Sequence, residues 1–167
     1  YRDYMSEDVS SKLFKRMLSG DGSTLSSAVR LVLSWLQREN VFKPWEAFYD
    51  DIVAWARQAP EPYFLWVFLL DVHFPYLPTA QFRSQSRLRE YEANLRLYTE
   101  TQEEYSDRVH DQLSTAYDDA VRYTDQFFAR LQADLDDPLI VVTGDHGEAF
   151  GEHGTYTHQD CLYEENI

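Results

Sequence analysis

Histidines and acidic residues gather at two places in the chain, each directly after a short apolar run. Four of the five histidines lie there: His73 after residues 63–70, and His146, His153 and His158 after residues 139–142. An Asp beside a His offers a divalent metal a hard oxygen and an imidazole nitrogen. Asp145 and His146 are therefore the strongest candidates for metal ligands.

The residues around this pair suit a binding loop. Gly144 and Gly147 flank it and permit a sharp turn with a close backbone approach. Two ligands do not make a tight metal site, so further ligands must come from elsewhere. The alternative is an Asp that caps the next element, with an incidental His beside it.

The other histidines suit the binding of an ester. A donor at His158 can bind the oxyanion of a bound ester, and His73 can face the same crevice from a loop that Pro75 and Pro78 stiffen. The alternatives are a surface His and a loop His without a role. We expect Asp71 to hold the His73 loop, and His153 to serve as a turn or supporting residue.

Two acidic residues allow a different chemistry. Glu148 and Glu152 lie four residues apart and could form the paired carboxylates of a glycoside hydrolase. Gly151 between them indicates an irregular turn, so this hypothesis is not favoured. We expect His110 to be solvated on a polar helix face, and Cys161 to be a small buried residue without a partner.

The two apolar runs must position these residues. Residues 63–70 and 139–142 are continuously apolar, which is typical of strands buried on both faces of a parallel sheet. Ligands bind at the carboxyl ends of such strands. An apolar stripe predicts a helix over residues 105–135 that connects the two strands by a right-handed crossover. The predicted fold class is therefore α/β.

Helices are also predicted elsewhere. Pro44 opens a helix that ends before Pro60, with Trp45, Phe48 and Ile52 on its apolar side and either Trp55 or Ala56 continuing it. Residues 1–40 are expected to be helical and polar, with apolar residues at helical spacing over 25–36. Residues 81–104 are charged and predict a surface helix or an excursion. Arginines in such a stretch more often form a solvated helix face than bind an anionic substrate.

Composition excludes several classes of protein. The 167 residues carry 29 acidic and 15 basic side chains, a net charge of −14, which disfavours nucleic acid and acidic membranes as partners. With few lysines, this composition suggests a halophilic source. One Cys excludes an internal disulfide framework. The longest apolar run, residues 63–70, is too short to span a membrane.

Two stretches together resemble the sulfatase family of the alkaline phosphatase superfamily. Residues 141–154 (VVTGDHGEAFGEHG) are similar to its late metal-site motif, and residues 70–78 (LDVHFPYLP) are similar to its His-x-Pro-Tyr motif. Residues 117–135 resemble the helix before the metal-site strand. The resemblance covers residues 45–167 and implies an alkaline-phosphatase-like sandwich, with a mostly parallel sheet flanked by helices.

The resemblance also implies roles for single residues. Asp145 and His146 match metal ligands, and His73 matches the His that contacts the sulfate ester and assists the leaving group. His158 matches the position where a Lys or His binds a sulfate oxygen. The family metal is usually calcium, and an Asp-His pair in place of Asp-Asn leaves manganese or zinc open. The implied substrate is a small-molecule or saccharide sulfate ester.

The chain departs from the family in two respects. It has no Cys/Ser-x-Pro-x-Arg motif, which in sulfatases supplies the formylglycine nucleophile, and no early pair of Asp ligands. We therefore expect formylglycine upstream of this chain. Residues 1–167 would then be a partial catalytic domain, inactive alone, with a segment of uncertain role over 1–44 and a sulfatase-like core over 45–167.

Two other functions stay open. A phosphatase or a phosphoryl or phosphoethanolamine transferase of the same superfamily has a similar Asp-His-Gly-Glu stretch, with a Thr nucleophile and zinc. A degenerate, non-catalytic binding domain is the third possibility. The Tyr-Glu-Glu stretch at residues 163–165 and the His-x-Pro-Tyr loop favour a sulfatase. The single Cys and the lack of an export signal favour the cytoplasm.

Overall fold

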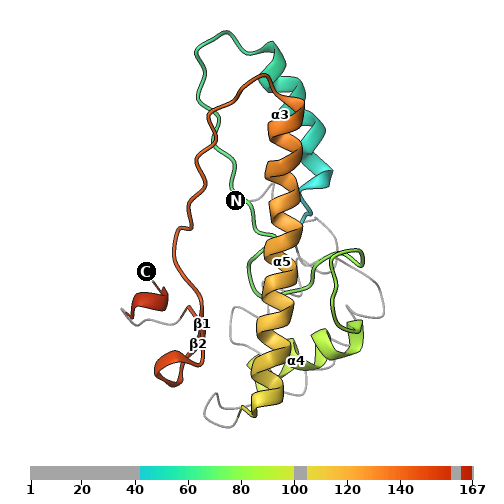
Figure 1. The fold of residues 1–167 in the computed structure, drawn as a ribbon, viewed down its shortest axis with the longest axis vertical. Helices are drawn as coiled ribbons and strands as arrows, with labels where there is room; N and C mark the ends of the chain where they lie inside the picture. Colours follow the sequence, from blue (N-terminus) through green and yellow to red (C-terminus); the bar gives the residue numbers. More distant parts are fainter. Residues whose placement is uncertain (1–41, 100–104, 159–162, 167) are drawn as a thin grey trace, which may run out of the picture.

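Three helices form the main body of the part of the chain that the structure describes (Figure 1). The computed structural model describes residues 42–99, 105–158 and 163–166; the helical pattern predicted over residues 25–36 and Cys161 lie outside these ranges. The helices are α3 (Glu46–Gln58), α4 (Arg87–Thr99) and α5 (Asp107–Asp134). Short elements follow: β1 (Ala149–Phe150), η2 (Glu152–Gly154), β2 (Tyr156–Thr157) and η3 (Glu164–Asn166).

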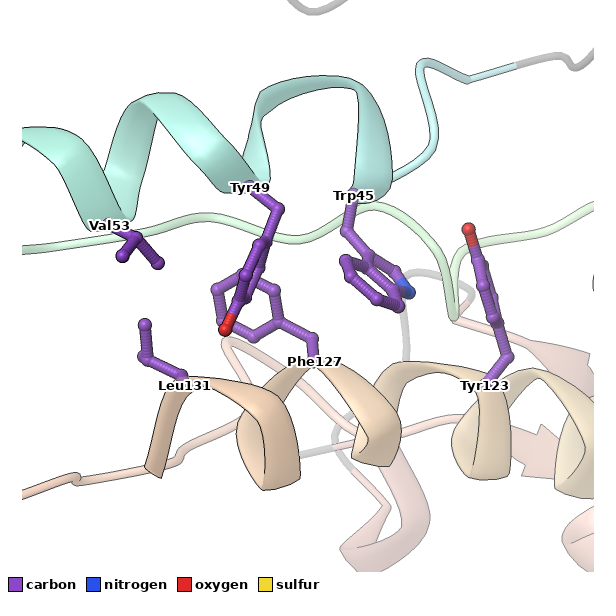
Figure 2. Packing of buried hydrophobic residues seen from close by; sticks show 6 residues of the cluster. All are labelled: Trp45, Tyr49, Val53, Tyr123, Phe127 and Leu131. Atoms are coloured by element: carbon purple, nitrogen blue, oxygen red, sulfur yellow. The ribbon is translucent and has the colours of Figure 1, made fainter. Parts of the chain in front are cut away.

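Helices α3 and α5 pack along one another and enclose the larger hydrophobic core (Figure 2). Its buried members are Trp45, Tyr49, Val53, Tyr123, Phe127 and Leu131. Trp45 and Phe127 meet edge to face with ring centroids 5.9 Å apart, an arrangement that the aromatic quadrupoles favour. Burying one such side chain contributes about 1.5–3 kcal/mol. This core holds together the two helices that the apolar spacing predicted.

The predicted apolar face of α3 is confirmed. Trp45 is buried, and Phe48 and Ile52 pack against the core. Of the two alternatives for the next position, Ala56 is buried and Trp55 is 48% exposed. On α5, the apolar residue Val121 lies outside the buried stripe and is 41% exposed. In both helices the buried face also contains a tyrosine, Tyr49 or Tyr123, because the hydroxyl of each reaches a carboxylate: Asp134 for Tyr49 and Glu46 for Tyr123.

Helix α4 is not the solvated surface helix that its charges predicted. Glu90 and Asn94 are fully buried against α5, together with Asp119 of that helix. Arg83 Nε donates to Glu90 Oε2 at 2.5 Å, and Ser84 N donates to Asp119 Oδ2 at 2.6 Å. Burial raises the pKa of Glu90 to about 7, although Arg83 opposes this shift. Charged residues in this region therefore form a buried polar layer.

The predicted parallel sheet is absent from the part of the chain that the structure describes. Residues 63–70 and 139–142 are extended but belong to no sheet, and the sheet that is present there pairs β1 with β2 in antiparallel order. In Figure 1 the two extended segments, green and orange-red, run beside the helical body. Extended backbone needs neighbouring strands to complete its hydrogen bonds, and the described residues supply none for these segments.

The two extended segments were also predicted to be buried on both faces, and this was wrong. Val67, Leu69 and Ile140 pack against the α3–α5 core. Phe64 is 88% exposed in the first segment, and Leu139, Val141 and Val142 are 93%, 80% and 63% exposed in the second. Each segment is therefore only partly buried and presents a bare apolar face. No helix of the described residues is long and apolar enough to cross a membrane.

Candidate functional site

The loop that follows residues 139–142 carries the Asp-His pair. The backbone N–H of His146 donates to Asp145 Oδ1 at 3.1 Å, which closes a tight turn around the pair. His146 Nδ1 lies 2.7 Å from the carbonyl oxygen of Gly147, so this nitrogen carries the proton and donates it. His146 Nε2 is thereby left with a free lone pair. Metal-binding histidines are commonly oriented in this way.

The geometry of the pair suits a shared divalent metal. His146 Nε2 and Asp145 Oδ1 are 3.9 Å apart. Two ligand atoms that each lie about 2.0–2.2 Å from one ion can be at most about 4.4 Å apart, so a single ion can reach both. Both side chains are accessible, with 36% and 63% of their surfaces exposed. Within residues 42–99, 105–158 and 163–166, no third His, Cys, Asp or Glu joins them in a complete metal site.

Three histidines from separate segments come together beside this loop. The rings of His146 and His158 have centroids 4.2 Å apart, and those of His73 and His158 are 5.3 Å apart. The sequence places His73 more than 70 residues away from the other two. The fold therefore brings the predicted ester-binding residues next to the predicted metal ligands, while their roles stay predictions.

Each ester-binding candidate has its Nδ1 engaged by the protein. His73 Nδ1 lies 2.7 Å from the carbonyl oxygen of Phe74, and His158 Nδ1 lies 3.4 Å from Glu148 Oε2. Since carbonyl and carboxylate oxygens only accept, both Nδ1 atoms carry protons. The Nε2 atoms are the ones that remain for a ligand. The arrangement can bind an anion when the imidazoles are protonated.

Glu148 is a residue of this site that the sequence analysis did not assign. Its side chain is only 8% exposed, and its second oxygen, Oε1, is buried without a hydrogen-bond partner. Burial, together with the Glu148 carboxylate, raises the pKa of Tyr76 and of Tyr117. Glu152 instead accepts from the backbone N–H of Phe150 at 2.6 Å. The spacing from His146 gave no indication that Glu148 would face His158.

A C-terminal turn supports the metal-site loop. A Cβ at Gly147 would lie 2.1 Å from the carbonyl oxygen of Glu165 in η3, so only glycine permits this contact. His153 Nδ1 lies 2.8 Å from Glu165 Oε1, and the His153 ring stacks on Tyr163 at 4.1 Å. The hydrogen bond from His153 lowers the pKa of Glu165. His153 thus sits in a turn, with a left-handed φ of 53°.

The loop that carries His73 is held by α4. Asn94 Oδ1 accepts from the backbone N–H of Tyr76 at 2.8 Å, and Asn94 Nδ2 donates to the Tyr76 carbonyl at 3.1 Å. This pair of bonds satisfies both main-chain groups of Tyr76, as a neighbouring strand would. Asn94 was not predicted to have this role, because a polar residue in a charged stretch gives no indication that it is buried.

Asp71 links the same loop to α3. Its Oδ1 accepts from the backbone N–H of Trp45 at 3.3 Å. Burial raises the pKa of Asp71 to about 6, against the lowering effect of that hydrogen bond. The backbone N–H of His73 donates to the Leu70 carbonyl at 3.1 Å, which places Asp71 and His73 in one turn. The carboxylate therefore holds the loop, as expected.

His110 is not the solvated residue that was predicted. It is half-buried, and its Nδ1 lies 3.3 Å from the hydroxyl of Tyr156 on β2. It lies outside the cluster formed by His73, His146 and His158. This contact follows from the β1–β2 hairpin packing on α5, which the sequence did not predict.

Comparison with known proteins gives one match. The protein family described as Sulfatase matches residues 21–167, a partial catalytic domain that contains every candidate residue above. The match begins earlier than the residues on which the resemblance rested. Neither the search of curated proteins nor the search of solved structures finds a match.

Proposed function

Because the chain belongs to the sulfatase family, we propose that it contributes part of the active site of a metal-dependent sulfuric ester hydrolase. The observation that carries this proposal is the convergence of His73 and His158 on the Asp145–His146 loop. Anion-binding imidazoles beside a candidate metal pair are what the hydrolysis of an anionic ester requires.

Each residue has a distinct part in this mechanism. Asp145 and His146 would hold the metal, which when bound polarises an ester oxygen and lowers the pKa of an oxygen nucleophile. His158, whose Nδ1 faces Glu148, directs its Nε2 to a sulfate oxygen. His73, whose Nδ1 proton is engaged by Phe74, presents Nε2 to the leaving oxygen and protonates it from the imidazolium form.

We also place the nucleophile outside these 167 residues. The sequence has no Cys/Ser-x-Pro-x-Arg motif, and formylglycine is therefore expected in a part of the protein that precedes Tyr1. The chain alone is then inactive, and its two candidate metal ligands bind metal weakly. The substrate is a small-molecule or saccharide sulfate ester.

The donor set bears on which metal is bound. Calcium takes oxygen ligands almost exclusively, whereas His146 offers an imidazole nitrogen whose lone pair is free. Imidazole with carboxylate suits manganese or zinc. The family's usual calcium therefore competes with two metals that this pair would hold more tightly.

The proposal is tested on the complete protein encoded by the gene that contains this chain. With 4-nitrophenyl sulfate, we expect turnover, and we expect His146→Ala to reduce kcat/KM about 10³-fold, which corresponds to about 4 kcal/mol. His110→Ala is the matched control and should stay within about threefold, because His110 lies outside the cluster. Chelation should abolish turnover, and manganese or zinc should restore it better than calcium.

The outcomes separate the candidate functions. Turnover that survives both chelation and His146→Ala would refute a metal-dependent mechanism. The imidazole ligand is also the observation that favours a zinc-dependent phosphoryl transferase, the second candidate. Hydrolysis of 4-nitrophenyl phosphate in preference to the sulfate would establish that alternative. Hydrolysis of neither ester would leave the non-catalytic binding domain.

A further inference from the structure

The Glu148 carboxylate lies between His158 and a buried tyrosine. Its Oε2 is 3.4 Å from His158 Nδ1. The other oxygen, Oε1, and the hydroxyl of Tyr76 are both buried, and neither has another hydrogen-bond partner among the residues that the structure describes. The Tyr76 hydroxyl faces the Glu148 carboxylate. A phenol donates and a carboxylate oxygen accepts, so one bond between them satisfies both buried groups.

Tyr76 is held in place at its backbone and at its ring. Asn94 of α4 binds both main-chain groups of this fully buried residue. The Tyr76 ring meets Tyr117 of α5 edge to face, with ring centroids 5.3 Å apart. Burial, together with the facing Glu148 carboxylate, raises the pKa of Tyr76, so the hydroxyl keeps its proton. The phenol is therefore a donor whose position is set by α4 and α5.

His158, in contrast, has little support from its own segment. Strand β2 ends at Thr157, whose φ of 62° lies in the left-handed region. This conformation costs a β-branched residue about 1–3 kcal/mol and persists only where surrounding contacts enforce it. The His158 ring is partly exposed, and the hydrogen bond at its Nδ1 decides which ring nitrogen carries the proton. The contact with Glu148 therefore fixes both the tautomer and the direction of Nε2.

We propose that Glu148 and Tyr76 are positioning residues of the reaction: Tyr76 fixes the Glu148 carboxylate, and Glu148 holds the His158 ring with Nε2 directed to the ester. This inference rests on the proposed function and adds two residues that act through His158. In this role neither residue needs to contact the ester. Buried partners of this kind commonly contribute about 10- to 100-fold to the activity of the residue they orient.

Kinetics of the complete protein with 4-nitrophenyl sulfate give the first test. Tyr76→Phe removes only the hydroxyl, and we expect it to lower kcat/KM about 10-fold; Glu148→Ala should lower it about 100-fold. Glu148→Gln retains an oxygen that accepts from His158 Nδ1, so it should stay within about 10-fold of wild type. Tyr117→Phe is the matched control, because it removes a hydroxyl from a ring that contacts Tyr76. It should stay within about twofold.

The same changes in a His158→Ala background separate positioning from structural support. A residue that acts through His158 has nothing to position once this ring is removed, so Tyr76→Phe and Glu148→Ala should then each cost less than about twofold. Losses of equal size in both backgrounds would make the pair a structural support of the β1–β2 hairpin and would overturn the inference.

The ring nitrogens of His158 provide a measurement that does not depend on turnover. In the complete protein labelled with ¹⁵N-histidine, at a pH where His158 is neutral, we expect NMR to show the proton on Nδ1 in the wild type and in Tyr117→Phe. In Glu148→Ala a larger fraction of molecules should carry it on Nε2. An unchanged tautomer in Glu148→Ala would overturn the inference while ester turnover leaves the proposed function standing. The expected tautomer change in a protein that hydrolyses neither sulfate nor phosphate esters would overturn the proposed function, and the positioning role in catalysis with it.

Discussion

Two apolar regions of the protein differ in how completely they are buried. In the α3–α5 core, Tyr49 and Phe127 are at most 2% exposed. In the extended segments 63–70 and 139–142, Phe64 and Leu139 are about nine-tenths exposed. A helix completes its backbone hydrogen bonds internally, so it needs only one neighbour against which to bury its apolar face. An extended segment needs neighbours at both edges and on both faces.

The candidate site lies directly after the two exposed extended segments, so the difference between the two regions affects the site. His73 follows the first extended segment, and Asp145 and His146 follow the second. The helical region fixes the His73 loop from one side, through Asn94 and through Asp71. On the other side, the bare faces of the segments have no packing partner among the described residues.

The largest expected effect is on the stability of the helical region. Phe127→Ala should lower the free energy of unfolding by about 3–5 kcal/mol, because it leaves a cavity between α3 and α5. Trp66→Ala removes a larger side chain from the bare face of segment 63–70, where Trp66 is 76% exposed. It should change stability by no more than about 0.5 kcal/mol. Urea denaturation followed by circular dichroism measures both, and equal losses would contradict the comparison.

The sequence predicted helices more successfully than sheets, for a physical reason. A helix is determined by residues three and four apart, so the stripe over residues 105–135 was sufficient to place α5. The strands predicted over 63–70 and 139–142 depend on partners that local composition does not identify. The candidate site follows the same rule: local pairs such as Asp145–His146 were identifiable, whereas the facing of Glu148 and His158 depends on the tertiary structure.

A smaller effect should appear where the two regions join, at Asp71. Its pKa is raised from 3.8 to about 6 in the folded state, so the folded protein holds a proton that the unfolded chain releases. The stability that comes from holding this proton is fully present below about pH 4 and is lost as the pH rises to about 6. The free energy of unfolding falls by about 1–3 kcal/mol over this range. Asp71→Asn should reduce the slope of the stability profile between pH 4 and pH 6 and leave the part that comes from Glu90, whose pKa is also raised. Asp50→Asn, on the exposed face of α3, should leave it unchanged; an unaltered slope in Asp71→Asn would refute the assignment.

The smallest effect on stability should come from Gly147→Ala, although its effect on the site should be large. The new Cβ would lie 2.1 Å from the Glu165 carbonyl oxygen, so η3 must move away from the metal-site loop. The global free energy of unfolding should change by only about 1 kcal/mol, since η3 contributes no residue to the α3–α5 core. The stacking of His153 on Tyr163 should be lost, which the ring-proton shifts of His153 report by NMR.

Gly154→Asn is the matched control, because a side chain there meets open space and Asn tolerates its φ of 71°. If Gly147→Ala left the His153 signals in place, η3 would not support the loop. If instead it unfolded the whole protein, the site region would be as tightly coupled to the helical core as α3 is to α5, and the contrast between the two regions would not hold.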